Sequence, residues 1–381
     1  MNITIVQGAF LPVPPIRGGA IEKAFYSLAH EFVKAGHNIN YISRLCDNLP
    51  KVQSVCPNFK HLRIKGFNAP RTILLLKLFD FLYSYRVLRS LPNSDILVTH
   101  TFWLPILSRI QSSMGKLYIH VGRFPKGQMR LYKNAARFQT VSAAIVEGIE
   151  RELPSSMHDR IVSIPYPLES NFLREVDCVS SRSKKILYAG RIHPEKGIGI
   201  LLDAFLSCCD SELKDWSLEI LGPWETKHGG AGLQYLEKLK GKASNVRQVS
   251  FVEPIFDQLS LAQKYADASI FVYPSLSERG ETFGLAALEA LASGCLTIVS
   301  SLECFLDFVR PGQNAFVFNH RQDDPSLSLK NTMIQVIQIL ENGNHEFLRT
   351  EARKTAEGYN CNNVAKLFLE DFQRVLDEDC K

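Results

Sequence analysis

Two glutamates, Glu281 and Glu289, stand eight residues apart in the segment Tyr273–Gly294, where an apolar strand pattern runs through a polar loop into a helical pattern. Glu289 lies in a helix that is otherwise apolar, and a carboxylate in such surroundings needs a hydrogen-bond partner, which ribose hydroxyls can supply. Gly280 and Gly284 let the backbone approach a ligand closely, and the N–H groups at the helix start suit an anion. These features predict a nucleotide-sugar site; the alternative for Glu289 is a solvated position on the helix surface.

The turn Ala189–Gly197 follows another strand pattern, precedes a helix and contains two cations that suit a diphosphate. The guanidinium of Arg191 can bind phosphate oxygens as a fork, and the ammonium of Lys196 can act as a point charge. The alternative is an ordinary turn with two exposed cations. The Glu281 segment in the same chain favours the diphosphate interpretation.

Two further candidates lie in the N-terminal half. Gly18 and Gly19 stand at the start of the first helical pattern, where backbone N–H groups can meet a phosphate or a sugar. Neither the Gly-x-Gly-x-x-Gly fingerprint nor the Walker lysine pattern is present, which disfavours a dinucleotide oxidoreductase and a nucleoside triphosphatase. His120 ends an apolar strand pattern and could bind the sugar or steady the reacting centre, with a structural histidine as the alternative; His100 is a weaker candidate.

The composition is that of a globular protein with two domains. A length of 381 residues is too great for one ordinary core, and 45% hydrophobic with 22% charged residues argues against extensive disorder. The net charge of +5 permits an anionic ligand or a membrane surface but does not call for nucleic acid. Nine cysteines without a Cys-x-x-Cys pair indicate reduced thiols rather than disulfides or a zinc site. The N-terminus resembles a first strand, not a signal peptide, and no apolar run is long enough to span a membrane.

Strand and helix patterns alternate along the chain, which predicts an α/β fold with parallel sheets. We expect two Rossmann-like domains, 1–165 and 168–360, joined at Pro165–Pro167, with the site in the cleft between them. The expected strands are 3–7, 37–42, 61–65, 95–99, 116–121, 138–141, 161–164, 185–189, 217–221, 246–251, 269–273, 296–300 and 315–318. The expected helices include 20–35, 198–208, 259–266, 283–293, 326–342 and 364–376.

Taken together, these motifs resemble those of the family-4 glycosyltransferases, which have the GT-B fold. The resemblance rests on Glu281 and Glu289 at Glu-x7-Glu spacing, on the Thr282–Leu285 core, on the turn at Gly190–Gly197 and on Gly18-Gly19. It implies a retaining transfer of a hexose-type sugar from a nucleotide-sugar donor, without a metal or other cofactor. It also implies that the final helix, in 361–381, crosses back to the N-terminal domain.

The resemblance further assigns roles to individual residues. Arg191 and Lys196 would bind the donor diphosphate, Glu289 the ribose, Glu281 the hexose, and His120 would lie near the transferred sugar. The catalytic candidates are thus Glu281, His120, Arg191 and Lys196, and the further donor-binding candidates are Gly18, Gly19, Glu253, Thr282, Phe283, Gly284, Leu285 and Glu289. The segment Ser301–Asp307 departs from the Gly-rich turn and Glu of the family, which leaves the identity of the donor open. Glu281 is not expected to be a nucleophile, because the family is usually explained by same-face attack.

The acceptor would be a glycan or a lipid-linked molecule, in the synthesis of cell-surface polysaccharide or glycolipid, and the enzyme would be cytoplasmic. Lys77, Arg86 and Arg89 occur among apolar and aromatic residues in Thr72–Leu91. A second basic segment contains Lys126, Arg130, Lys133 and Arg137. Such surfaces can rest on the inner face of an anionic membrane. An ordinary amphipathic helix packed on the sheet is the favoured interpretation of the first stretch. Competing functions are a GT-B epimerase or phosphorylase, and a catalytically silent nucleotide-sugar-binding protein.

Overall fold

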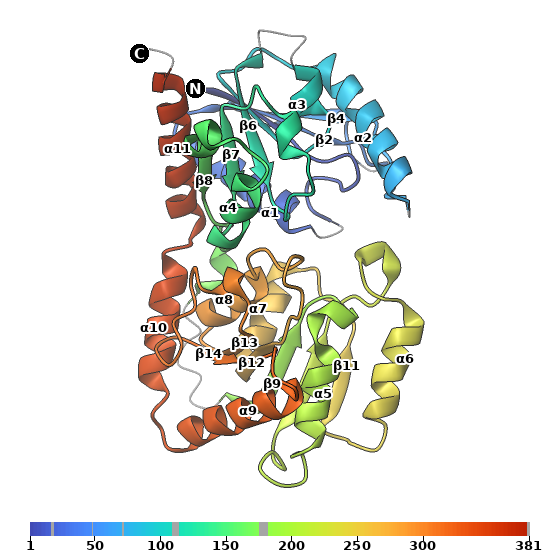
Figure 1. The fold of residues 1–381 in the computed structure, drawn as a ribbon, viewed down its shortest axis with the longest axis vertical. Coiled ribbons are helices and arrows are strands. Elements are labelled where there is room, and N and C mark those ends of the chain that lie inside the picture. The colour runs from blue at the N-terminus through green and yellow to red at the C-terminus, as the bar shows by residue number, and fades with distance from the viewer. Residues whose placement is uncertain (17–18, 48, 71, 109–113, 175–181, 379–381) are drawn as a thin grey trace. The chain divides into compact units, whose positions relative to one another are not determined.

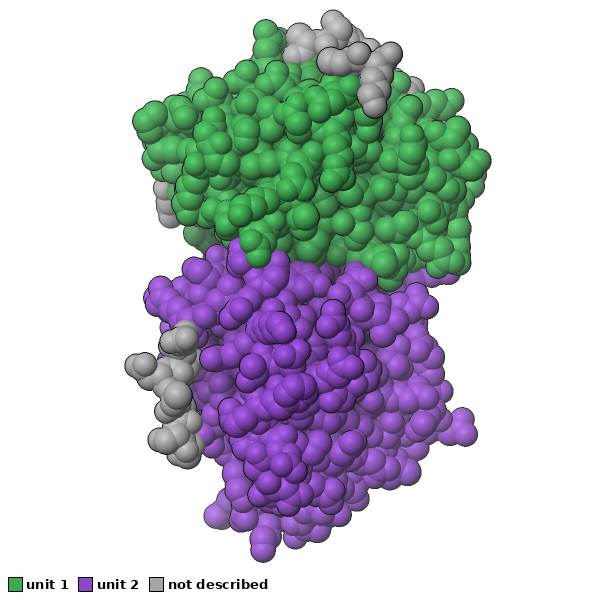
Figure 2. All heavy atoms as spheres, turned by 90° about the vertical axis from the view of Figure 1, so that its left-hand side faces the viewer, with its two compact units in different colours: residues 1–167, 361–381 green, residues 168–360 purple. Residues whose placement is uncertain are grey.

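The computed structural model describes residues 1–16, 19–47, 49–70, 72–108, 114–174 and 182–378 (Figure 1). The chain forms two compact units, which Figure 2 shows in different colours. Unit 1 consists of Met1–Pro167 and Cys361–Lys381, and unit 2 of Leu168–Asn360. Each unit has one largely parallel sheet with helices, so the predicted α/β architecture with two Rossmann-like domains is confirmed. The cleft expected between the domains stays a prediction.

Unit 1 contains a sheet with the strand order β3-β4-β2-β1-β5-β6-β7-β8. Every neighbouring pair is parallel except β3–β4. The strands are β1 (Asn2–Val6), β2 (Asn38–Arg44), β3 (Val52–Cys56), β4 (Phe59–Ile64), β5 (Ile96–Thr99), β6 (Lys116–Val121), β7 (Arg137–Thr140) and β8 (Ile161–Ser163). The α-helices are α1 (Ala20–Lys34), α2 (Ile73–Leu88), α3 (Leu104–Leu107), α4 (Ala143–Glu150) and α11 (Cys361–Asp377).

Unit 2 contains a sheet with the order β11-β10-β9-β12-β13-β14, in which all pairs are parallel. The chain winds outwards from β9 in one direction and then from β12 in the other, as in a doubly wound fold. The strands are β9 (Ser183–Ala189), β10 (Ser217–Leu221), β11 (Val249–Val252), β12 (Ala268–Tyr273), β13 (Leu296–Ser300) and β14 (Phe316–Phe318). The α-helices are α5 (Ile198–Leu206), α6 (Leu233–Lys242), α7 (Gln258–Asp267), α8 (Leu285–Ala292), α9 (Pro325–Glu341) and α10 (Glu346–Glu357).

Local sequence explains most of these elements. In α1 the apolar residues recur at helical spacing, and Phe25, Leu28 and Phe32 are buried. The helix ends where Gly36 adopts a φ of 87°, which a glycine takes without strain. Every residue of β12 and β13 is buried, as expected for central strands covered on both faces.

The last helix, α11, belongs to unit 1 and not to the unit that precedes it in the chain. Its Phe368 and Phe372 pack against aromatic rings of α1 and β6. Asp371 Oδ2 accepts hydrogen bonds from Tyr118 Oη at 2.9 Å and from Arg137 Nε at 3.1 Å. All three polar side chains are buried, so this helix completes the core of unit 1.

The structure corrects the expected elements in a few places. The antiparallel edge strand β3 and the helix α10 were not expected, and the helix after Glu281 begins at Leu285 rather than at Phe283. Within the described ranges, no helix is long and apolar enough to cross a membrane.

Candidate functional site

Two loops of unit 2 bring the predicted donor residues together. One follows β9 and contains Arg191 and Lys196; the other follows β12 and contains Glu281. Because β9 and β12 are neighbours at the point where the strand order reverses, both loops lie at the carboxyl edge where open α/β sheets bind ligands.

Glycine 197 allows these two loops to touch. It has a φ of 69°, and a Cβ at this position would overlap the carbonyl oxygen of Pro274 in the other loop. Leu276 N also donates to Glu195 O at 2.8 Å, which ties the two loops together. The Gly197 of the sequence motif is therefore required for this packing, independently of any ligand.

Lys196 and Glu281 form a buried ion pair between the loops. Lys196 Nζ lies 2.6 Å from Glu281 Oε2, and the two side chains are only 6% and 9% exposed. The ammonium also lies 5.4 Å from the centre of the Tyr273 ring. Burial, followed by the nearby Glu281 carboxylate, raises the pKa of the Tyr273 hydroxyl well above its usual value. The sequence placed these two residues in one site but did not predict that they pair.

Arg191 is also paired, but at the surface. Its Nη2 donates to Glu195 Oε1 at 2.8 Å and its Nη1 to Gly229 O at 2.8 Å, with the side chain 40% exposed. An anion entering these loops would therefore compete with a carboxylate for each of the two cations. Such an exchange is inexpensive at Arg191, since exposed ion pairs are worth at most about 1 kcal/mol.

The start of α8 faces the same edge of the sheet. Gly284 precedes the helix with a φ of 84°, and a Cβ there would overlap the ring of Phe305. The side chain of Phe283 is buried against Phe308 and Tyr359, so only its backbone is open to a role in binding. The first N–H groups of a helix have no acceptor within it and attract anions.

Glu289 is 7% exposed, which rules out the solvated position considered from the sequence. Tyr265 Oη, from α7, donates to Glu289 Oε2 at 3.2 Å. Burial, followed by the Glu289 carboxylate, raises the pKa of Tyr265 well above its usual value. The expected partner of this carboxylate was a ribose hydroxyl, and the structure shows that a tyrosine hydroxyl already binds it.

Two other donor candidates are less constrained. Glu253 is exposed directly after β11, which lies two strands away from β9. Thr282 is half-buried in the loop between Glu281 and α8.

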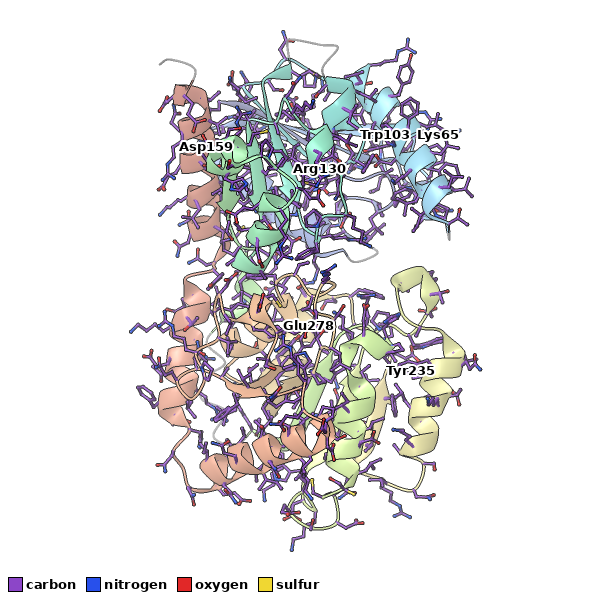
Figure 3. The ribbon with its side chains drawn as sticks, viewed as in Figure 1. Lys65, Trp103, Arg130, Asp159, Tyr235 and Glu278 are labelled. Atoms are coloured by element: carbon purple, nitrogen blue, oxygen red, sulfur yellow. The ribbon has the colours of Figure 1, made fainter. Side chains whose placement is uncertain are left out.

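The loop that departs from the family pattern, Ser301–Asp307, borders a cavity of about 560 Å³ in unit 2. The cavity is lined by residues that include Glu303, Phe305 and Arg321. Arg321 holds Glu278, labelled in Figure 3, through two hydrogen bonds of 2.8 Å, and thereby fixes the loop that carries Glu281.

In unit 1, His120 is buried at the end of β6 and is held by two side chains. Gln139 Nε2 donates to the carbonyls of Thr140 and Ile164, so its Oε1 accepts from His120 Nδ1–H at 2.5 Å. Nε2 is then the unprotonated nitrogen, which accepts from Tyr166 Oη at 3.2 Å. Burial lowers the pKa of His120 to about 4, although the bond to Gln139 opposes this shift.

Gly19 lies beside a buried carboxylate. Its φ is 105°, and a Cβ would overlap the Glu22 carboxylate in the first turn of α1. Burial raises the pKa of Glu22, while a backbone hydrogen bond and Arg123 lower it. The neighbouring candidate Gly18 lies outside the described residues.

His100 stands beside His120, with 4.9 Å between the ring centres. Its Nδ1 donates to Val6 O at 2.9 Å, and burial lowers its pKa well below the usual value. Both histidines contact the edge or face of Phe25, so His100 is placed as a neutral packing residue.

Four side chains that hold the candidate site residues in place were not predicted from the sequence. They are Gln139, Tyr166, Glu195 and Tyr265. Glu195 stood within the quoted motif and could have been found from its i,i+4 spacing to Arg191. Tyr166 was interpreted only as part of a linker, and nothing local in the sequence marks Gln139 or Tyr265. Among the described residues there is no cluster of three or more His, Cys, Asp or Glu that could hold a metal.

The two doubly wound units define the fold of the GT-B glycosyltransferases, and solved structures agree. Sucrose-phosphate synthase from Thermosynechococcus elongatus has a TM-score of 0.81 at 18% identity, covering 99% of this chain and 100% of that one. HepE from Anabaena, solved with UDP and glucose, has a TM-score of 0.71 at 15% identity, covering 98% and 100%.

Residues 171–345, which make up most of unit 2, match the family model "Glycosyl transferases group 1". Phosphatidyl-myo-inositol mannosyltransferase from Mycobacterium tuberculosis is 28% identical over 169 residues, which are 44% of this chain. The matched region spans 40% of the length of that relative.

Proposed function

We propose that this protein is a retaining, metal-independent family-4 glycosyltransferase that moves a hexose-type sugar from a nucleoside-diphosphate sugar to a glycan or lipid-linked acceptor. The observation that carries the proposal is the pair of loops at the switch point of unit 2. They join Lys196, Arg191 and Glu281 beside the start of α8, inside the region that matches the group 1 family.

The chemistry of the site suits departure of a diphosphate. Negative charge builds on the leaving phosphate as the glycosidic bond breaks, and cations and helix N-termini placed there lower the barrier. Arg191 can exchange Glu195 for a phosphate oxygen at little cost, because this ion pair is partly exposed. Lys196 stays buried and supplies a charge that water screens poorly.

The two acids of the motif differ in their proposed roles. We assign Glu281 to the donor hexose and not to nucleophilic attack, because its carboxylate is bound to the Lys196 ammonium. For Glu289 we propose the ribose, with Tyr265 orienting the carboxylate from the other side. In retaining transfer by same-face attack, the leaving phosphate would take the proton of the acceptor hydroxyl.

We assign acceptor recognition to unit 1, with His120 as the neutral imidazole near the transferred sugar. The named activity of the mycobacterial relative, on a phosphatidyl-inositol, supports a lipid-linked acceptor and a role in glycolipid or surface-polysaccharide synthesis. We therefore propose that the protein acts at the cytoplasmic face of a membrane.

The test is a thermal-shift screen of nucleoside-diphosphate sugars, followed by donor-hydrolysis assays with the best stabiliser. We expect Lys196→Ala and Arg191→Ala to lower turnover by roughly 10²–10³, by analogy with lost oxyanion donors. Lys242→Ala, which removes an exposed lysine of α6 in the same unit, is the matched control and should keep full activity. Equal turnover of Lys196→Ala and wild type, at a temperature where both are folded, would refute the diphosphate role.

Two further readouts address the finer parts of the proposal. Activity should survive treatment with EDTA, and NMR of the first product formed should show the same anomeric configuration as the donor sugar. An inverted anomer, or activity that returns only with added divalent metal, would contradict the family-4 assignment.

A further inference from the structure

The first two turns of α2 expose apolar side chains in all directions. We call Ile73–Leu78 the apolar tip. Its five large hydrophobic residues are between 39% and 79% exposed: Ile73, Leu74, Leu75, Leu76 and Leu78. The remaining member, Lys77, is exposed as well. The sequence favoured an ordinary helix packed on the sheet, and for these two turns that expectation is wrong.

The rest of α2 is firmly anchored in unit 1. Asp80 Oδ2 accepts the backbone N–H groups of Phe102 and Trp103, each at 3.0 Å, and Tyr83 is fully buried. Trp103, labelled beside α2 in Figure 3, donates from Nε1 to Lys77 O at 2.8 Å. The apolar tip is therefore the continuation of a rigid helix and not a frayed end.

Exposed apolar residues are concentrated here. Including Leu82 and Tyr85, α2 holds seven of the 17 exposed large hydrophobic residues found in the described part of the chain. Scattered exposed leucines need no explanation, but a contiguous group marks a surface that meets an apolar partner. Burying such a group against an apolar partner would release free energy in proportion to the apolar area removed from water.

The charge of unit 1 indicates what that partner is. Unit 1 has 24 Lys and Arg against 14 Asp and Glu, a net charge of +10, whereas unit 2 has 20 against 25, a net charge of −5. Lys77 is exposed on α2 and Arg89 is exposed directly after it, and Arg86 of α2 lies over the ring of Phe67. A surface that is apolar at its tip and cationic around it is complementary to anionic lipid, whereas a second copy of the same surface would repel it.

A second basic segment, residues 126–133, is connected to α2 through Phe102, whose backbone N–H donates to Asp80. Tyr132 Oη donates to Phe102 O at 3.0 Å, which joins the two regions. Lys126, Arg130 and Lys133 of this segment are exposed. Arg137, which the sequence grouped with them, instead lies buried against α11 and does not contribute.

The dimensions exclude a spanning helix and fit an interfacial one. A helix of 16 residues is about 24 Å long, shorter than the roughly 30 Å hydrocarbon core of a bilayer. The six residues of the apolar tip rise about 9 Å along the helix axis, which is less than half of that hydrocarbon thickness, so an inserted tip would stay within one leaflet.

We propose that the apolar tip of α2 inserts into the interface of an anionic lipid bilayer, with Lys77, Arg86, Arg89 and the 126–133 segment at the lipid headgroups. This binding needs no donor sugar, so it is measured separately from glycosyl transfer.

The test is flotation of the whole protein with phosphatidylcholine vesicles that contain or lack phosphatidylglycerol, at about 0.1 M salt. We expect binding only to the anionic vesicles. The double variant Ile73→Ser/Leu74→Ser should bind about tenfold more weakly, because each lost side chain is only partly inserted. Lys77→Gln and Arg89→Gln should each weaken binding about fivefold and reduce its salt dependence.

The matched control is Leu259→Ser/Leu327→Ser in unit 2, whose side chains are 52% and 51% exposed on α7 and α9. This control should bind as the wild type does. A direct readout is Leu74→Trp, whose added fluorescence should shift to the blue with anionic vesicles and be quenched by brominated lipid.

Three results would overturn the proposal. They are no flotation with anionic vesicles, equal binding by the tip variant and its control, and a lipid-free dimer in sedimentation that Ile73→Ser/Leu74→Ser abolishes. The last result would assign the apolar tip to a second copy of the chain.

Discussion

Replacing Lys196 by methionine should destabilise unit 2 more than any other removal of a single charge from the candidate loops. The substitution keeps the length of the side chain but leaves the Glu281 carboxylate without its partner at 2.6 Å. Because the two side chains are 6% and 9% exposed, water cannot replace the lost ammonium. Removing one partner of a buried ion pair costs roughly 3–5 kcal/mol, so we expect a loss of this size.

The double variant Lys196→Met/Glu281→Gln should recover most of that loss. It removes both charges together, and a neutral pair of similar shape is often as stable as the buried ion pair it replaces. The coupling energy of the double-mutant cycle should therefore be about 3 kcal/mol. The exposed pair Lys242–Asp203 has a similar distance of 2.7 Å with side chains 37% and 47% exposed, and its cycle should give less than about 1 kcal/mol.

Urea denaturation followed by tryptophan fluorescence provides the assay. Trp103 is the single tryptophan of unit 1, so in a Trp103→Phe background Trp216 and Trp224 report on unit 2. The slope with urea should stay constant through the series, which shows that only stability has changed. Coupling at Lys196–Glu281 that is no larger than at Lys242–Asp203 would refute the reasoning that burial makes this pair strong.

Three further predictions concern other parts of the structure. Burial lowers the pKa of His61 to about 3 and that of His120 to about 4, so the unfolded chain binds protons first as the pH falls below 6.5. The free energy of unfolding should then drop by about 1.4 kcal/mol per pH unit for each histidine. In urea titrations between pH 6.5 and 5, the free energy of unfolding of His61→Gln should fall by about 2 kcal/mol less than that of the wild type. Equal decreases in the two proteins would contradict this. Gln139→Glu should raise the pKa of His120 by at least one unit in an NMR titration, whereas Gln139→Leu should lower it further, because the bond to Gln139 favours the charged ring. Gly197→Ala should lower the stability measured by thermal unfolding by about 3 kcal/mol or more, because of the positive φ and the overlap with the neighbouring loop. Its control, Gly199→Ala, lies inside α5 with open space around it and should raise the stability by up to about 1 kcal/mol.

Most of the parallel strands were predictable because they are continuous apolar runs, and β6, β10 and β13 have the expected bounds. The edge strand β3 was missed because its sequence, VQSVC, is half polar and largely exposed, so no burial pattern marks it. Helix α10 was missed because only Leu348, Ala352 and Ala356 of its twelve residues are buried. Amphipathic spacing was present there, but the apolar stripe is short and made mostly of alanine.

The candidate site, like the fold, was predictable from the sequence only in part. Short motifs identified Lys196 and Glu281 as members of one site, since each follows a strand in a recognisable loop. The two partners stand 85 residues apart in the chain, and they meet only because β9 and β12 are neighbours in the sheet. The same holds for Tyr265 and Glu289, whose contact depends on where α7 and α8 pack. Local sequence contains no signal for such contacts, because they follow from strand order rather than from spacing.

The return of α11 to unit 1 makes unit 2 an insertion within another domain. Its two ends meet, since Leu168 N donates to Tyr359 O at 2.7 Å and Leu168 pairs with Asn360 as an isolated bridge. During synthesis, unit 2 can close its core while unit 1 still waits for Asp371, the buried partner of Tyr118 and Arg137. At 5–20 residues per second, the 193 residues between Pro167 and Cys361 take roughly 10–40 s to make. The domain whose sequence begins first is thus the last to be completed on the ribosome.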